Sequence, residues 1–258
     1  MAIETLPEAS LPVTRPFRVK FGFLTSTPII AVATICLVLI ILMAIFAPLL
    51  APRDPLLLTP SLRLKPSSAQ YLLGTDAYGR DLLSRIIYGA RISLVIGLGA
   101  AVCSIAIGLL IGLVAGFFRW VDAVMMRVMD GLMAIPAILL AIAVVSLSGA
   151  SIWTVMVAIT IPEIPRVARL VRSVVLTARE EPYVEAAISL GSSLPKIMWR
   201  HLMPNTIAPL IVQGTYVCAS AILTEAILSF LAPASRRRRR PGATSWPRAA
   251  RSSRSSRR

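Results

Sequence analysis

The chain alternates between long apolar runs and short segments that are charged or rich in proline. Ile29 to Leu50 is nearly uncharged for 22 residues, and about 20 helical residues cross a bilayer core of about 30 Å. Similar runs follow at residues 92–118, at about 124–147, from about 152 onward, and at 207–231. The pattern predicts an all-α, polytopic bundle of membrane-spanning helices with five spans. Basic residues ahead of the first run indicate an uncleaved anchor whose N-terminus lies inside.

The segments between the runs are assigned to the two sides of the membrane by alternation. Residues 51–90 hold four prolines and several charges, so this segment is expected outside the lipid. Residues 163–205 contain six basic side chains and fall on the inside, in agreement with the positive-inside rule. The predicted organisation is a cytoplasmic segment 1–28, a first span 29–50, an extracytoplasmic segment 51–90, a transmembrane core 91–231 with a cytoplasmic loop 177–205, and a tail 232–258.

The composition strengthens the membrane interpretation. Hydrophobic residues make up 56% of the chain, charged residues only 15%, and the mean hydropathy is +0.77. Soluble domains are nearer 45–50% apolar and about 25% charged, so the composition excludes a disordered protein and argues against an ordinary soluble enzyme. The net charge is +15, but ten arginines lie in residues 232–258, which leaves +5 for the rest. Three cysteines within apolar runs are expected to be buried hydrophobes.

The inner segment 182–204 predicts two short helices joined by a turn. Pro182 suits the first turn of a helix, and Gly191 suits the left-handed residue that ends one. Ser192 or Ser193 is expected to cap the second helix, and Pro204 to close it. A helical hairpin on the membrane surface is well shaped to enter a groove on a partner protein.

The residues of this hairpin resemble a known motif, the EAA loop of ABC importer permeases, which docks the cytosolic ATPase subunit in that family. The match rests on the spacing of Glu185, Ala186, Ala187, Gly191, His201 and Pro204. It departs from the general pattern at His201 and Met203, where the family has Ile and Leu. By resemblance, Glu185 and Gly191 are expected to dock the ATPase, and the two alanines to allow close approach.

A second stretch narrows the resemblance. Residues 73–94, 130–136 and 168–172 are similar to the C-type permease subunit of dipeptide, oligopeptide and nickel importers. The resemblance covers about residues 20–231 and implies a six-span permease in the bacterial inner membrane. It implies a second permease subunit, two cytosolic ATPase subunits, an extracytoplasmic solute-binding protein and membrane lipid as partners. The expected solute is a peptide, with nickel or another non-peptide solute as the alternative.

The chain is expected to be a transporter subunit rather than an enzyme. It contains no P-loop, HExxH or GxSxG sequence, so ATP would be hydrolysed by partner subunits. No cofactor and no metal is expected, and the lone histidine, His201, favours a packing or docking role over metal binding. A membrane-embedded enzyme would need convergent polar residues within the spans, and only isolated ones are found.

Several charged residues near the span ends are candidates for structural or pathway roles. Asp76, Arg80, Asp81 and Arg85 alternate in sign just before the second span and are expected to pair and fix the outer entrance. Asp130 is expected near the inner end of the third span, and Glu225 near the outer end of the fifth. Ionisable groups at membrane depth are costly, so each is a candidate functional residue.

The tail 232–258 does not fit the resemblance, because it cannot form the sixth span. Alternation of the spans places the tail outside the membrane, whereas the positive-inside rule would place such an arginine-rich segment inside. One hypothesis is a shifted reading frame near residue 232, which resequencing of the coding DNA would test. The alternative is a genuine basic tail that binds anionic lipid or nucleic acid. Nucleic-acid binding would leave the spacing of residues 185–204 without a role.

Overall fold

The computed structural model describes residues 28–149 and 151–238, with side chains as far as residue 231. All its named elements are helices, beginning with α2 (Pro28–Ile45) and the short α3 (Ala47–Leu50). A 3-10 turn at Pro60–Leu62 and two isolated bridges interrupt an irregular stretch before the next helix. The bundle then consists of α4 (Leu82–Phe117), α5 (Arg119–Ala134), α6 (Ala137–Ser148), α7 (Ile152–Ala178), α8 (Pro182–Ser189), α9 (Leu194–Ile197), η2 (Met198–Leu202) and α10 (Met203–Arg238).

Three helices are long and apolar enough to cross a membrane. They are α2, α4 and the continuous helix that α9, η2 and α10 form from Leu194 to Phe230. The α5–α6 pair adds a fourth if it counts as one broken span, because its two halves meet at 86°. The break falls at Pro136, the residue before α6. The fourth predicted span, from about residue 152, corresponds to α7, which does not meet the same criteria in the described residues. Its C-terminal half carries three arginines.

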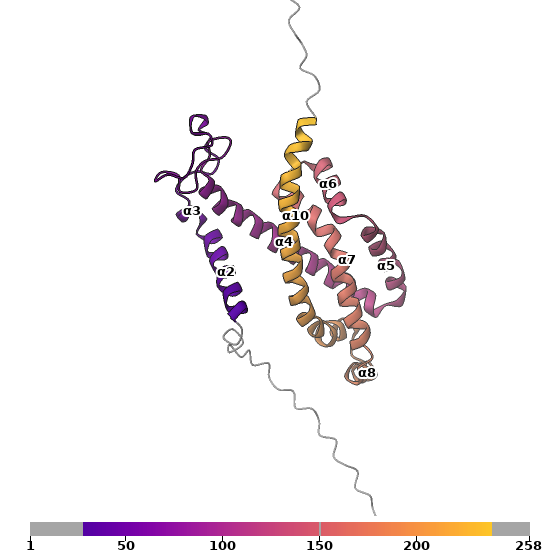
Figure 1. Cartoon of the computed structure of the whole chain (residues 1–258). Coiled ribbons are helices and arrows are strands. Elements are labelled where there is room, and N and C mark those ends of the chain that lie inside the picture. The colour runs from indigo at the N-terminus through magenta and orange to yellow at the C-terminus, as the bar shows by residue number, and fades with distance from the viewer. Residues whose placement is uncertain (1–27, 150, 239–258) are drawn as a thin grey trace, which may run out of the picture.

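Figure 1 shows α4 crossing the molecule and joining two parts of it. At one end of α4 lie α3 and the irregular stretch, with α2 beside them. Helices α5, α7 and α10 pack against the rest of α4, α6 lies against α7, and α8 lies at the opposite end of the molecule from α3. α4 begins at Leu82, so residues 82–90, expected in the broken outer segment, are instead its first turns.

A stripe of glycines lets α4 and α7 pack closely. A Cβ atom added at Gly108, Gly112 or Gly116 would lie 2.6, 2.6 and 2.7 Å from the Cβ atoms of Val167, Val171 and Val175, respectively. Real Cβ atoms do not approach so closely, so each valine occupies the space that a side chain on α4 would need. The three valines are fully buried. The small-residue series in the sequence therefore marks a helix–helix contact.

Two predictions from the sequence concern residues that the structure does not describe. Residues 1–27 of the predicted cytoplasmic segment lie outside the described ranges. Residues 239–258 of the tail, for which a frame shift or a basic binding segment was considered, lie outside them as well. Within the described part, α10 continues to Arg238, beyond the predicted span end at residue 231.

Candidate functional site

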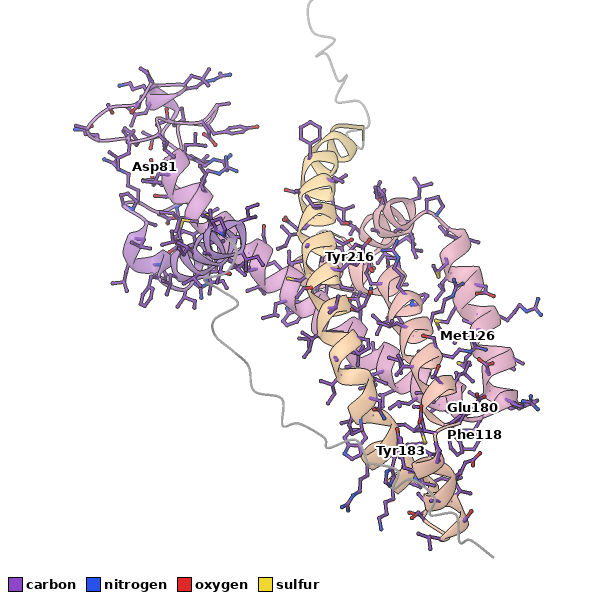
Figure 2. All side chains as sticks on the ribbon, turned by 60° about the horizontal axis from the view of Figure 1, so that its bottom comes forward. Asp81, Phe118, Met126, Glu180, Tyr183 and Tyr216 are labelled. Atoms are coloured by element: carbon purple, nitrogen blue, oxygen red, sulfur yellow. The ribbon has the colours of Figure 1, made fainter. Side chains whose placement is uncertain are left out.

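The hairpin predicted from residues 182–204 is present at the end of the bundle where α7 stops. α8 and α9 lie between α7 and α10, so the hairpin connects two helices of the bundle directly. In Figure 2, Tyr183 lies at this end together with Glu180 and Phe118, while Asp81 lies in the distant part of the molecule. A displacement of the hairpin would therefore act on both α7 and α10.

The boundaries of α8 follow from its residues. Pro182 occupies the first turn, where the missing N–H costs nothing, and Glu185 places a negative charge near the positive end of the helix dipole. Gly191 has a φ of +72° after the helix ends. Its N–H donates to the Ile188 carbonyl at 2.9 Å, and the Ser192 N–H donates to the Ala187 carbonyl at 3.0 Å. This pair of bonds is a Schellman motif, so the predicted glycine cap is confirmed.

The second half of the hairpin differs from expectation at its end. Ser193 is the N-cap of α9, although its side chain makes no capping hydrogen bond, and a proline occupies the first turn. Pro204 was expected to close this helix, but the helix continues through it into α10. The five residues before α10, Met198–Leu202, form a π-helical turn. We attribute the continuity to this wider turn, because it changes which carbonyl faces the proline ring.

One face of the hairpin packs against the bundle. Val184 and Ala187 on α8 are buried, together with Ile197 and Leu202 on the following turns, and all four belong to one hydrophobic cluster with α7 and α10 residues. Ala187 was expected to allow a partner to approach. Its buried position shows instead that its small side chain serves the contact between the hairpin and its own bundle.

The opposite face is exposed and includes a group of large apolar side chains. Glu185, Ala186, Gly191 and Pro204 are exposed, as docking residues would be. Leu190 is 85% exposed and Trp199 63%. Ile188, Leu194 and Tyr183 are also exposed. Sequence reasoning missed these apolar residues, although apolar side chains inside a charged cytoplasmic loop are a visible signal. Exposed apolar groups of this kind mark interaction sites.

His201 and Tyr183 form the link between the two arms of the hairpin. Their ring centroids lie 6.1 Å apart, and His201 is half-buried. Asn205, in the first turn of α10, donates to the Tyr183 hydroxyl at 2.8 Å and to the His201 carbonyl at 2.6 Å. His201 therefore packs within the hairpin.

At the other end of the molecule, Asp76 organises the stretch before α4. Its Oδ1 accepts the backbone N–H groups of Tyr78 and Arg80, at 2.7 and 3.0 Å. Its Oδ2 pairs with Arg80 Nε at 2.9 Å and with Arg85 Nη1 at 2.5 Å. Burial alone would raise the pKa of Asp76, but the backbone N–H groups and the Arg80 side chain together lower it to about 2. The expected pairing of Asp76 with both arginines is present.

Asp81 has a different role from the one expected. Rather than pairing with an arginine, it is the N-cap of α4, and its side chain accepts the Ser84 N–H at 2.9 Å. The carboxylate is 5% exposed, and a buried cap of this type fixes where a helix begins. Just before it, Gly79 has a φ of +75°, and a Cβ there would lie 1.8 Å from the Thr59 carbonyl oxygen. The turn thus requires glycine.

The two remaining candidates both have partners. Ser93 on α4 donates to Glu225 Oε2 on α10 at 3.0 Å. Asp130 on α5 forms an ion pair with Arg169 on α7, in which both side chains are about half exposed. One helical turn further along α7, Arg172 binds Asp122 through two nitrogens, with Nη2 at 2.6 Å from Oδ2. These pairs hold α5 against α7, and Asp122 was not among the residues singled out from the sequence.

The sequence does not reveal that Glu163 is buried. It was counted with the charged inner segment, but it lies within α7 and is only 4% exposed. Its Oε1 accepts from Arg166 Nη1 at 2.9 Å and from the Ser220 hydroxyl on α10 at 3.3 Å. Its Oε2 is buried and has no hydrogen-bond partner among the described residues. Buried ionisable groups in membrane proteins are functional candidates by default.

Comparison with known proteins gives consistent relatives. Residues 104–246 match the family described as binding-protein-dependent transport system inner membrane component. A probable peptide ABC transporter permease of Sinorhizobium fredii is 55% identical over 190 residues, which cover 74% of this chain and 65% of that protein. A dipeptide transport system permease of Alkalihalophilus pseudofirmus is 41% identical over 226 residues, covering 87% and 74%.

A di/tripeptide transport system permease of Pseudomonas aeruginosa is 44% identical over 202 residues, covering 76% of this chain and 67% of the relative. The chain spans just under two thirds of the length of the Sinorhizobium protein and somewhat more of the other two. The helical bundle, the glycine stripe and the hairpin agree with this similarity. The chain belongs to the family of binding-protein-dependent transport system inner membrane components.

Proposed function

We propose that this chain is a permease subunit of an ATP-driven ABC importer for short peptides. The observation that carries the proposal is the hairpin at one end of the bundle, whose outer face combines Glu185 and Ala186 with exposed Leu190 and Trp199. Membership in an inner-membrane transport family supports it. The names of the three relatives refer to peptides, dipeptides and di/tripeptides, and this supports a peptide as the solute.

In this proposal the hairpin is the surface that a separate cytosolic ATPase subunit binds. Glu185 and the glycine cap define the geometry of α8, and the apolar side chains of Leu190 and Trp199 supply area that becomes buried on docking. A second permease subunit, a second ATPase subunit and an extracytoplasmic binding protein complete the importer. The chain itself binds no cofactor and breaks no bond. Its role is to change conformation when the ATPase subunits close.

The direction of force transfer follows from the contacts of the hairpin. α8 is joined to α7 through a turn of three residues, and the Tyr183 hydroxyl links it to Asn205 on α10. Val184 and Ala187 pack the hairpin onto the bundle core. A movement of α8 toward the ATPase would therefore displace the ends of α7 and α10 together, which opens the solute pathway on one side at a time.

The docking role is tested by replacing Gly191 with leucine in the assembled importer. The left-handed backbone at Gly191 is unfavourable for leucine, so the cap of α8 should be lost. We expect membrane insertion to be unchanged, while co-purification of the ATPase subunits and ATP-driven peptide uptake are abolished. Gly149→Leu is the matched control, because Gly149 also has a positive φ, of +83°, and open space around it, but lies between α6 and α7.

A second variant tests the apolar face without changing the backbone. Leu190→Asp places a charge on the outer surface of the hairpin, and Leu58→Asp makes the same change at a leucine that is 60% exposed at the other end of the molecule. Only Leu190→Asp should weaken ATPase binding in a pulldown. Equal binding by both variants and by Gly191→Leu would refute the docking role.

A further inference from the structure

A cavity of about 860 Å³ lies at the end of the molecule opposite the hairpin. It is formed by three parts of the chain: the stretch just after α3, the first turns of α4, and the outer end of α10. Its volume lies within the range of about 300–1,000 Å³ that is usual for small-molecule sites. Nothing in the docking function of the hairpin accounts for it.

The polar lining of this cavity has both signs of charge. Arg53, Arg80 and Arg85 contribute guanidinium groups, and Glu225 contributes a carboxylate from α10. Asp54 adds a second acid at the rim. Pro48, Ile92 and Leu56 supply apolar walls between them. A site with opposite charges and an apolar middle suits a ligand whose two ends are oppositely charged.

The two ends of the cavity are set by one face of α4. Arg85, Gly89 and Ser93 follow one another at four-residue spacing, and therefore lie on the same side of the helix. Ser93 holds Glu225 by a hydrogen bond of 3.0 Å, which fixes the carboxylate at that level. Eight residues of helix rise by about 12 Å, which sets the scale of the distance between the two charged groups.

Both groups keep capacity for a ligand. Arg85 uses Nη1 for Asp76, while its Nε and Nη2 atoms make no hydrogen bond to the described residues, and its side chain is 42% exposed. Glu225 accepts one hydrogen bond through Oε2, and its Oε1 has no hydrogen-bond partner in the same part of the structure. An extended peptide covers at most about 3.3–3.6 Å per residue, so two or three residues match this separation.

We propose that this cavity binds a short peptide with both termini charged, its ammonium group at Glu225 and its carboxylate at Arg85. The inference rests on the proposed peptide import and adds a binding site on the permease itself. Gly89 lies between the two charged residues on α4. The space beside it is open, because an added Cβ would meet nothing within 4 Å. A ligand that connects Arg85 to Glu225 must pass over this glycine.

The test uses a thiol reporter at this position. In the assembled importer, with Cys36, Cys103 and Cys218 replaced by alanine, Gly89→Cys is labelled with a water-soluble maleimide in the absence of ATP. Ala-Ala at ten times its dissociation constant should slow labelling about tenfold, because the free fraction of a site falls as 1/(1 + [L]/Kd). Leu58→Cys, an exposed position outside the cavity lining, is the control and should react at an unchanged rate.

Chemically blocked peptides show which terminus of the peptide binds which residue of the cavity. N-acetyl-Ala-Ala-amide should give no protection, since it carries neither charge. Acetylation alone should weaken protection, and Glu225→Gln should remove the difference between Ala-Ala and its acetylated form. Arg85→Gln should remove the difference between Ala-Ala and Ala-Ala-amide. These comparisons are made within one variant, so a general change in stability does not imitate them.

Three results would overturn the site. One is equal protection by the blocked dipeptide, another is absence of protection by Ala-Ala, and the third is a reporter that does not react at all because another subunit fills the cavity. Binding is measured without ATP, so it is separate from transport. If the importer takes up peptides but Ala-Ala does not protect Gly89→Cys from labelling, only this binding site is refuted. If Ala-Ala protects Gly89→Cys but no ATP-driven uptake occurs, only the proposed function is refuted.

Discussion

The side-chain amide of Asn205 donates to the hydroxyl of Tyr183 at 2.8 Å, and this bond joins the first turn of α10 to the first turn of α8. The two residues are 22 positions apart in the chain. Both lie at the surface, so the bond links the exposed arm of the hairpin to the helix that runs through the bundle. It is a direct mechanical contact between the proposed docking surface and α10.

Tyr183→Phe removes only the hydroxyl of this contact. Loss of one exposed hydrogen bond costs about 0.5–1.5 kcal/mol, so the fold should be retained. We expect ATPase binding to persist in a pulldown, while peptide uptake per ATP hydrolysed falls, because movement of α8 is transmitted less completely to α10. Tyr78→Phe, at an exposed tyrosine in the stretch before α4, is the control. Unchanged coupling in both variants would contradict the role of the bond.

Gly112→Ala tests the contact between α4 and α7. The new methyl group would lie 2.6 Å from the Cβ of Val171, so the helices must separate. Overpacking of this kind typically costs about 1–3 kcal/mol, and the melting temperature of the purified protein should fall. Gly131→Ala on α5 meets nothing within 4 Å and should be neutral or slightly stabilising, because alanine favours a helix. A similar melting temperature for the two variants would count against close packing at Gly112.

Glu163 and Arg166 are best tested together. Arg166→Met leaves the Glu163 carboxylate, which is 4% exposed, without its ion-pair partner, and we expect a loss of about 1–3 kcal/mol, the cost of an unsatisfied buried polar group. The double variant Glu163→Leu/Arg166→Met removes both charges and should recover most of that stability. Thermal unfolding of the two single variants and the double variant gives the coupling energy. Additive effects would show that the pair contributes nothing to the fold.

The pH dependence of the outer stretch follows from Asp76. Because its pKa is lowered to about 2 from an ordinary value of 3.8, the folded state favours the ionised carboxylate. Its contribution is therefore complete above pH 3.8 and is lost as the pH falls through about 2. Proteolysis of residues 51–81 should stay slow at pH 5 and accelerate below pH 3.5. Asp76→Asn should be cleaved rapidly at pH 5, and a pH-independent wild type would contradict the assignment.

Several features of the fold were readable in the sequence because one residue type fixes them. The break at Pro136, the start of α8 at Pro182 and its end at Gly191 follow from backbone chemistry alone. The four-residue spacing of the glycines on α4 is typical of close helix contacts, although their partner valines could not be identified without the structure. Such local signals do not depend on what lies across the bundle.

Other features depend on packing between distant segments, and the sequence could not show them. Glu163 resembles its charged neighbours in the chain, and only the position of α10 reveals that it is buried. Ala186 and Ala187 look equivalent, yet one faces outward and the other packs on the bundle. Pro204 predicts a helix end, because the sequence does not show the π-helical turn before it that lets the helix continue.

The fit of Val167, Val171 and Val175 into three successive glycine positions has a consequence for how the protein moves. Sliding or rotating α4 against α7 would unseat all three valines at once, so the two helices should travel as a rigid body. Conformational change must then be taken up at a hinge elsewhere. The 86° corner between α5 and α6 suits such a hinge, since a proline already interrupts the backbone there.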